Sequence, residues 1–148
     1  MKDASITWII KQDNNEETVT YDYYLGNVNG LNTTTVHIQA WNNYQGFDDA
    51  KDVTNARLVI KTLTIDDSYI FDYLTVKINN QVKSLTKYDD IKYGISIGSL
   101  SGAKNTGIES EQYKLTNRNM CDIELTFNSI DYRVKEGIKN LILDIESN

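Results

Sequence analysis

The chain has 148 residues, a net charge of −6 and one cysteine, so its length fits one domain of the usual ~100–150 residues and excludes an internal disulfide framework. No run reaches the roughly 18 consecutive apolar residues of a membrane span, and the first residues lack the order of a signal peptide. The acidic balance disfavours contact with a phosphate backbone, so we expect a cytoplasmically made protein with neither nucleic acid nor membrane as a partner.

Alternating apolar residues predict short β-strands along the whole chain. Ile6, Trp8 and Ile10 share one face of the first strand, and a tyrosine-rich, β-prone run follows from Glu17 to Leu25. Further alternating runs lie at residues 36–41, 56–60, 74–78, 82–85, 93–97, 121–127 and 141–145. No window keeps helical spacing for three turns. We therefore expect residues 1–148 to form a single all-β domain, an antiparallel Ig-like or jelly-roll-like β-sandwich of about 8–9 strands.

Two connections between these runs contain residue types that predict their conformation. Asn79-Asn80 stands between two alternating runs, and asparagine tolerates positive φ, so these residues predict a tight hairpin turn. Residues 98–107 are rich in serine, glycine and asparagine and predict a flexible loop. That loop lacks the Gly-Lys-Ser/Thr ending of a phosphate-binding loop.

The connection after the run at residues 36–41 is longer than a hairpin needs, and aromatic residues gather in it. Aromatic rings bring large apolar area to a contact at little entropic cost. We predict a partner-binding surface made of the following residues: Trp41, Asn42, Asn43, Tyr44 and Phe47. The alternative is that Trp41 and Phe47 fold back and cover the end of the sandwich. We expect contacts to use this loop, or residues 98–107, more than a sheet face.

Candidate catalytic and metal-ligating residues are few. His37 is the only histidine and should face solvent or a partner, whereas Cys121 is in phase with buried positions, so no nucleophile and base are paired. One histidine and one cysteine cannot supply a usual zinc site. Asp48, Asp49 and Asp52 are the best candidates for calcium, but such residues are also ordinary turn formers. We predict no enzyme activity, no cofactor and no bound metal.

The segment Trp41-Asn42-Asn43-Tyr44-Gln45-Gly46, followed by Asp52-Val53-Thr54-Asn55-Ala56, resembles a pattern in virion proteins of phages of low-GC Gram-positive bacteria. Residues 94–98, 113–115, 121–127 and 137–143 are similar to the closing half of the same Ig-like sandwich, so the resemblance spans about residues 35–145. It implies a structural role in the particle, as a tail, baseplate or fibre-associated protein or a capsid decoration protein. It implies no catalytic residues.

The sequence therefore predicts a non-enzymatic virion component that acts through contacts with other virion proteins, as a homo-oligomer within the particle. An acidic chain without disulfides suits a part that is assembled in the host cytoplasm and remains in the virion. The alternative function is a carbohydrate-binding module that recognises host-surface glycans through Trp41, Tyr44 and Phe47.

Overall fold

The computed structural model describes residues 1–12, 15–19, 23–28, 33–62, 70–108, 118–128 and 137–147. These residues form β-strands, loops and one short 3₁₀ turn at 70–73, with no α-helix among them. Within these ranges, no helix is long and apolar enough to cross a membrane. The same ranges contain eleven strands: β1 (Ile6–Gln12), β2 (Asn15–Val19), β3 (Tyr23–Val28), β4 (Thr33–Asn42), β5 (Val53–Thr62), β6 (Leu74–Ile78), β7 (Gln81–Lys83), β8 (Thr86–Asp89), β9 (Lys92–Leu100), β10 (Met120–Asn128) and β11 (Gly137–Glu146).

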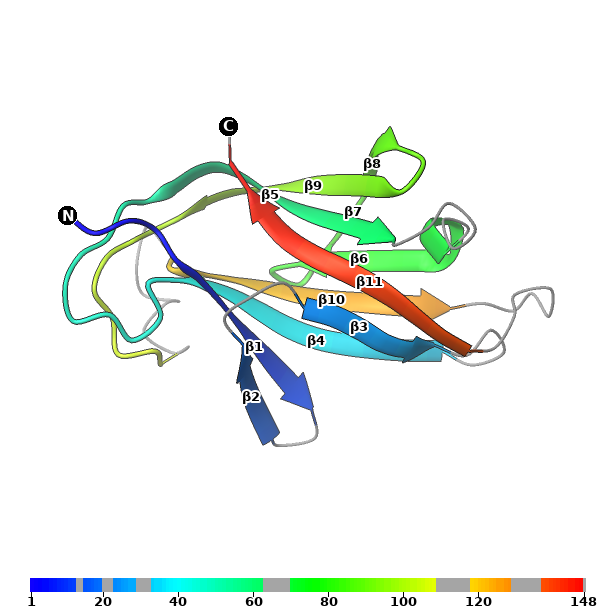
Figure 1. Ribbon diagram of the computed structural model, residues 1–148, viewed down its shortest axis with the longest axis horizontal. Helices are drawn as coiled ribbons and strands as arrows, with labels where there is room; N and C mark the ends of the chain where they lie inside the picture. The colour runs from blue at the N-terminus through cyan, green and yellow to red at the C-terminus, as the bar shows by residue number, and fades with distance from the viewer. Residues whose placement is uncertain are drawn as a thin grey trace.

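The strands form two antiparallel sheets that enclose one core (Figure 1). The six-stranded sheet has the order β2-β1-β4-β10-β6-β7, and the five-stranded sheet has the order β3-β11-β5-β9-β8. Within them, β3-β11-β5-β9 faces β4-β10-β6-β7, which is the strand order of a jelly roll. The predicted antiparallel β-sandwich is confirmed. Of the two arrangements expected from the sequence, the strand order matches the jelly roll.

The core lies between the sheets and takes alternate residues from each strand. Ile38 of β4 pairs with Ile123 of β10, and Leu58 and Ile60 of β5 come from the opposite sheet. All four side chains have no exposed surface. Burying a side chain of this size contributes about 1.5–3 kcal/mol, so this layer supplies much of the stability. The alternation read from the sequence therefore identifies the core face of these strands.

Two of the expected runs lie where the chain passes from one sheet to the other. The Glu17–Leu25 run contains β2 of the six-stranded sheet and β3 of the five-stranded sheet, and residues 82–85 join β7 to β8, which also lie in different sheets. The sequence pattern of a run does not show where the chain passes from one sheet to the other. The described residues contain eleven strands, of which β3–β7 and β9–β11 form the two facing four-stranded layers.

Of the two predicted connections, the structure confirms the hairpin turn and places the start of the loop later in the chain. Asn79 and Asn80 have φ values of 48° and 68° and join the paired residues Ile78 and Gln81, so the tight hairpin is confirmed. The loop expected at residues 98–107 begins later, because β9 continues to Leu100. A register shift beside Gly98, where φ is 78°, lets the strand continue past the glycine.

Four residues of the five-stranded sheet pack together and hold its short edge strand, β8. We call Arg57, Tyr88, Lys92 and Gly94 the Tyr88 patch. A Cβ atom at Gly94 would lie 2.4 Å from Cε2 of Tyr88, so the ring occupies the space that a side chain there would fill. The Arg57 guanidinium lies 5.2 Å from the ring centroid and donates a hydrogen bond of 3.3 Å to the Tyr88 hydroxyl. The Lys92 ammonium lies 5.9 Å from the same centroid. The ring is thus directed onto its own sheet.

Candidate functional site

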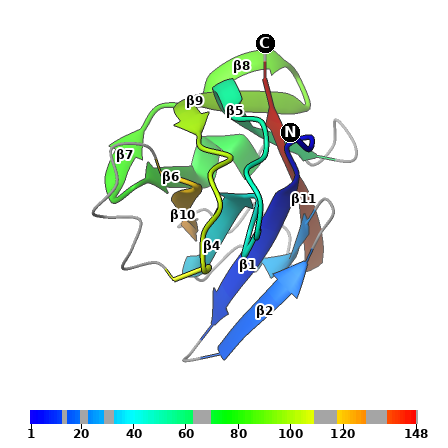
Figure 2. The same ribbon diagram turned by 90° about the vertical axis from the view of Figure 1, so that its left-hand side faces the viewer.

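Two loops that are far apart in the sequence lie side by side at one end of the sandwich (Figure 2). They are residues 43–52, between β4 and β5, and residues 101–108, after β9, and together we call them the ledge. Ala50 N donates to Gly102 O at 2.7 Å, and Asn105 N donates to Gly46 O at 3.2 Å. A Cβ atom at Gly102 would lie 2.1 Å from Ala50 O, so this close approach of two backbones requires a glycine.

Acidic side chains add to this pairing. Asp52 Oδ1 accepts a hydrogen bond from Gly102 N at 2.8 Å, and Asp49 Oδ1 accepts one from Lys104 N at 3.0 Å. These two carboxylates, proposed from the sequence as calcium ligands or turn formers, therefore join one loop to the other. Among the described residues, no group of three histidine, cysteine, aspartate or glutamate side chains is placed to hold a metal ion.

Buried asparagine side chains hold the ledge to the sheets. Asn42 Nδ2 donates to Lys51 O and Leu100 O, and its Oδ1 accepts from Ser5 N. Asn43 Nδ2 donates to Asp48 O and Gly102 O, each at 2.9 Å. Asn119, just before β10, donates to Ser101 O and Ala103 O, each at 2.8 Å. Each amide donates to main-chain carbonyl groups of the loops or of β9, and these bonds fix the loop backbones before any partner binds.

The N-terminal segment supports the same end of the molecule. Lys2 forms a parallel bridge with Ala50, and its carbonyl accepts a hydrogen bond of 3.0 Å from Lys51 N. Asn43 N donates to Ser5 O at 3.0 Å. The Lys51 ammonium lies 3.2 Å from the Asp3 carboxylate, but both groups are well exposed, so this ion pair adds little. Residues 2–5 consequently hold the ledge through main-chain hydrogen bonds.

The five predicted partner-binding residues do not share one surface. Trp41 is 1% exposed and packs with Ile9 and Met120 on the outer face of the six-stranded sheet, where its Nε1 donates to Gln39 Oε1 at 3.1 Å. Tyr44 is half-buried and packs edge-on against Trp41, with 5.1 Å between the ring centroids. Asn42 and Asn43 are buried. Trp41, Asn42 and Asn43 therefore build the end of the sandwich, and Tyr44 covers part of it.

Phe47 is the exception. Its side chain is 94% exposed, the highest value among the large apolar residues of the described ranges. Ile108 on the ledge is 51% exposed, and Met1 beside the ledge is 86% exposed. Trp41 and Phe47 therefore differ, because Trp41 covers the sandwich, as the alternative expects, whereas Phe47 stands in solvent.

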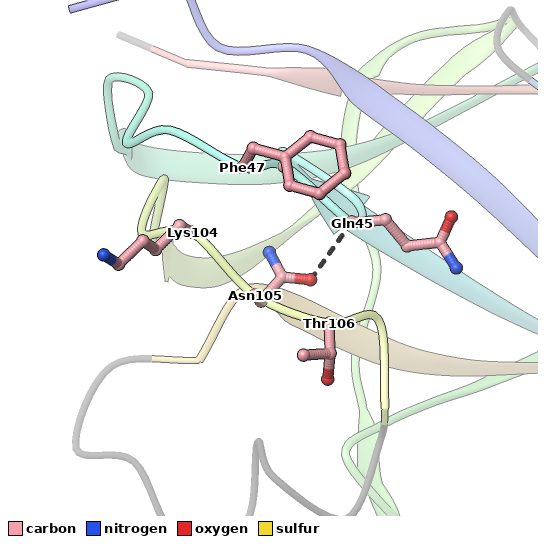
Figure 3. A pocket seen from close by; sticks show the side chains of 6 residues that line it. Gln45, Phe47, Lys104, Asn105 and Thr106 are labelled. Carbon is pink, nitrogen blue, oxygen red and sulfur yellow. Dashed lines mark hydrogen bonds between the residues drawn. The ribbon is translucent and has the colours of Figure 1, made fainter.

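An open depression of about 680 Å³ lies beside Phe47. Its lining consists of Gln45, Gly46, Phe47, Lys104, Asn105 and Thr106, which come from both loops of the ledge (Figure 3). Asn105 stands at its centre and orders it, since its Oδ1 accepts hydrogen bonds from Gln45 N at 3.2 Å and Gly107 N at 2.9 Å. Its Nδ2 donates to Asn43 O at 2.8 Å. Sequence reasoning did not single out Gln45 or Asn105, because their proximity depends on pairing across sixty residues of chain.

The imidazole of His37 and the thiol of Cys121 are separated. His37 Nε2 lies 2.5 Å from Asp122 Oδ1 on the outer face of the six-stranded sheet, whereas Cys121 belongs to the core between the sheets. Burial raises the pKa of the Cys121 thiol to about 12, and the charge of Asp122 adds to this rise. The only thiol is therefore neutral near pH 7 and lies on the opposite side of the sheet from the only imidazole, so the two cannot act together.

Comparison of the chain with protein-family models, with curated proteins and with solved structures finds no match.

Proposed function

We propose that this chain is a non-enzymatic structural component of a phage particle, associated with the tail, baseplate or fibre or decorating the capsid, and that it presents the ledge to a partner. The sequence resemblance of residues 41–56 to virion proteins supports the proposal that the chain is part of a phage particle. The separation of His37 from Cys121 supports a role without catalysis.

The observation that carries the proposal is the placement of Phe47. A fully exposed phenylalanine does not stabilise the isolated chain, yet the loop that presents it is fixed by buried asparagines and paired main-chain groups. A binding surface that is ordered in advance loses less conformational entropy when its partner arrives. An exposed aromatic ring on an ordered loop is the arrangement of an anchor residue in a contact.

The partners proposed for the rest of the surface are other virion proteins, including further copies of this chain, because repeated parts of a particle assemble around symmetry axes. Assembly would take place in the host cytoplasm. The net charge of −6 means that a basic patch on a neighbour would speed association and make it sensitive to salt.

Purified particles provide the test. Mass spectrometry should detect the chain in particles purified to constant density, and cryo-EM should place its sandwich on the tail or the capsid surface. Absence of the chain from such particles would contradict the proposal. Incorporation of the Phe47→Ala chain into particles then distinguishes two uses of the ledge. Val82→Ala, at a 66% exposed residue of β7, is the control. Reduced incorporation for Phe47→Ala alone would make the ledge an assembly contact, and normal incorporation would leave it free for another ligand.

A further inference from the structure

We propose that the depression beside Phe47 is a binding site for an uncharged saccharide. This inference deepens the proposed function, because it names the ligand of the surface that the particle would present. It depends on four features of the ledge: one exposed ring, side chains that can bind hydroxyl groups, a locally balanced charge and a strained residue that is held in place.

The exposed ring supplies the first element of such a site. A pyranose has one face covered by C–H groups, and this face packs against the electron-rich face of an aromatic ring. Phe47 is 94% exposed and lines the depression at its upper side in Figure 3. A protein contact normally surrounds such a ring with further apolar area. Here polar side chains also line the depression beside the ring.

The polar lining supplies the second element. Gln45, Lys104 and Thr106 line the same depression, and their side chains carry an amide, an ammonium and a hydroxyl group. An amide presents one acceptor and two donors, and it can therefore bind two neighbouring hydroxyl groups of a sugar. The volume of about 680 Å³ lies within the usual range of ~300–1,000 Å³ for small-ligand sites. One or two sugar units would fit this space.

The charges of the site favour an uncharged ligand. Lys104 is a cation, but its own backbone N–H donates to the Asp49 carboxylate at 3.0 Å, so a negative charge lies next to it. Among the described residues no arginine lines the depression, and there an acidic sugar would lack the paired cations that usually bind a carboxylate or phosphate. Asn105 uses its amide for the loop backbone, so Gln45 is the other amide among the described lining residues.

Gln45 also has an unusual backbone. Its φ is 55°, in the left-handed region that glycine and asparagine adopt far more readily than glutamine. Asn105 Oδ1 accepts a hydrogen bond from Gln45 N and so helps to maintain this conformation. Gly107, where φ is 78°, leaves room for the Gln45 side chain, since a Cβ atom there would lie 2.6 Å from Gln45 Cγ. A strained residue maintained at an exposed site is a recognised sign of function.

The strain makes a discriminating variant possible. Gln45→Gly removes the amide but suits the left-handed backbone, so the loop should keep its shape and stability. Phe47→Ala removes the ring, and Val82→Ala is the matched control on β7, away from the ledge. The full chain and the three variants are to be titrated by calorimetry with methyl glycosides of neutral hexoses and N-acetylhexosamines, after a screen on an array of neutral and acidic glycans.

The expected result is saturable binding of at least one neutral glycan, weakened about tenfold or more by Gln45→Gly and by Phe47→Ala and unchanged by Val82→Ala. Absence of binding to every neutral glycan would overturn the inference, as would binding that both ledge variants leave intact. If glycans do not bind but Phe47→Ala reduces incorporation into particles, the ledge contacts a virion protein and only this inference fails. If a glycan binds but particles lack the chain, the site is correct and the proposed particle is wrong.

Discussion

The ledge and the Tyr88 patch both place an aromatic ring at the periphery of the sandwich, but they use it in opposite ways. In the Tyr88 patch the ring lies on Gly94, with two cations near it, and is 39% exposed. On the ledge, hydrogen bonds hold the backbone and leave the Phe47 ring 94% exposed. A ring that completes its own sheet adds stability, whereas a ring that stands free on a fixed loop is available to a partner. The following variants, from the largest expected effect to the smallest, test this contrast.

Trp41→Ala should cost the most, although Trp41 is only six residues from Phe47. The ring is 1% exposed and packs with Ile9, Met120 and Tyr44, so its loss removes buried area and leaves a cavity. We expect the free energy of unfolding to fall by about 3–5 kcal/mol in urea denaturation. A loss below about 1 kcal/mol would show that Trp41 behaves as a surface residue, like Phe47, and would contradict the contrast between a buried and an exposed ring.

Asn42→Ala should come next, because it removes the amide that joins the N-terminal segment, the ledge and β9. Main-chain groups of Ser5, Lys51 and Leu100 would lose their partner. Buried groups left without hydrogen bonds cost about 1–3 kcal/mol each, and partial relaxation should leave a total loss of about 2–4 kcal/mol. Asn42→Asp keeps the shape but replaces the donor with a carboxylate that faces the Lys51 and Leu100 carbonyls, so its loss should be at least as large. An unchanged midpoint for both variants would refute the role of the buried amide.

Gly94→Ala tests the Tyr88 patch directly. The added methyl group would occupy the position of the Tyr88 ring, so we expect a loss of about 1–3 kcal/mol in unfolding free energy. A double-mutant cycle with Tyr88→Ala isolates the contact, since the cost of the methyl group should largely disappear once the ring is absent. Equal cost in both backgrounds would show that the glycine is needed for another reason.

Cys121 reports whether the end of the sandwich beneath the ledge stays closed. Burial raises the pKa of its thiol to about 12, so Ellman's reagent should not modify the folded chain at pH 8 and should modify it fully in urea. The unfolded thiol titrates near pH 8.5, so the unfolded state releases a proton between about pH 9 and 12 that the folded state retains. The contribution of the thiol to the free energy of unfolding is therefore fully present below pH 8. It decreases as pH rises, by up to ~1.4 kcal/mol per pH unit.

Cys121→Ala removes this group from the titration. The alkaline slope of wild-type stability should exceed that of Cys121→Ala, and the difference between them belongs to the thiol alone. Rapid modification of folded wild type would show that the closed end opens readily, and it would contradict the rigid support proposed for the ledge.

Phe47→Ala should have the smallest effect on stability, because its ring has almost no contacts to lose. We expect a change within about 0.5 kcal/mol in unfolding free energy. The same variant should show its effect only when a ligand or neighbour is present. A large loss of stability would mean that the ring covers the sandwich, as Trp41 does, and the binding role would then have no support.

The sequence predicts the layered core well, because each strand carries its own alternation of buried and exposed residues. Ile38, Ile123 and Leu58 are identified from neighbours two positions away, without knowledge of pairing. The hairpin at Asn79-Asn80 is likewise a local property of two residues that accept positive φ.

The candidate site is less predictable, because its contacts join distant segments. Asn42 and Asn43 have the composition of a surface turn, yet they are buried because carbonyl groups of Leu100 and Gly102 lie beside them. Gln39 and Trp41 are on the face opposite to Ile38, as the alternation indicates, but that outer face is itself covered at these residues. The pattern gives the side of a strand and does not tell whether something packs on that side.

The position of β11 has a consequence for how the chain acquires its structure during synthesis. This strand is the latest of the eleven to leave the ribosome, yet it lies inside its sheet, between β3 and β5. Until it arrives, those two strands present unpaired hydrogen-bonding edges, and the apolar residues Leu58 and Ile60 lack their cross-strand neighbours Leu143 and Ile145. Strand edges of this kind can pair with other nascent chains. Successful folding of this protein therefore depends on a late insertion step, in which the C-terminal strand must enter the sheet before a second chain does.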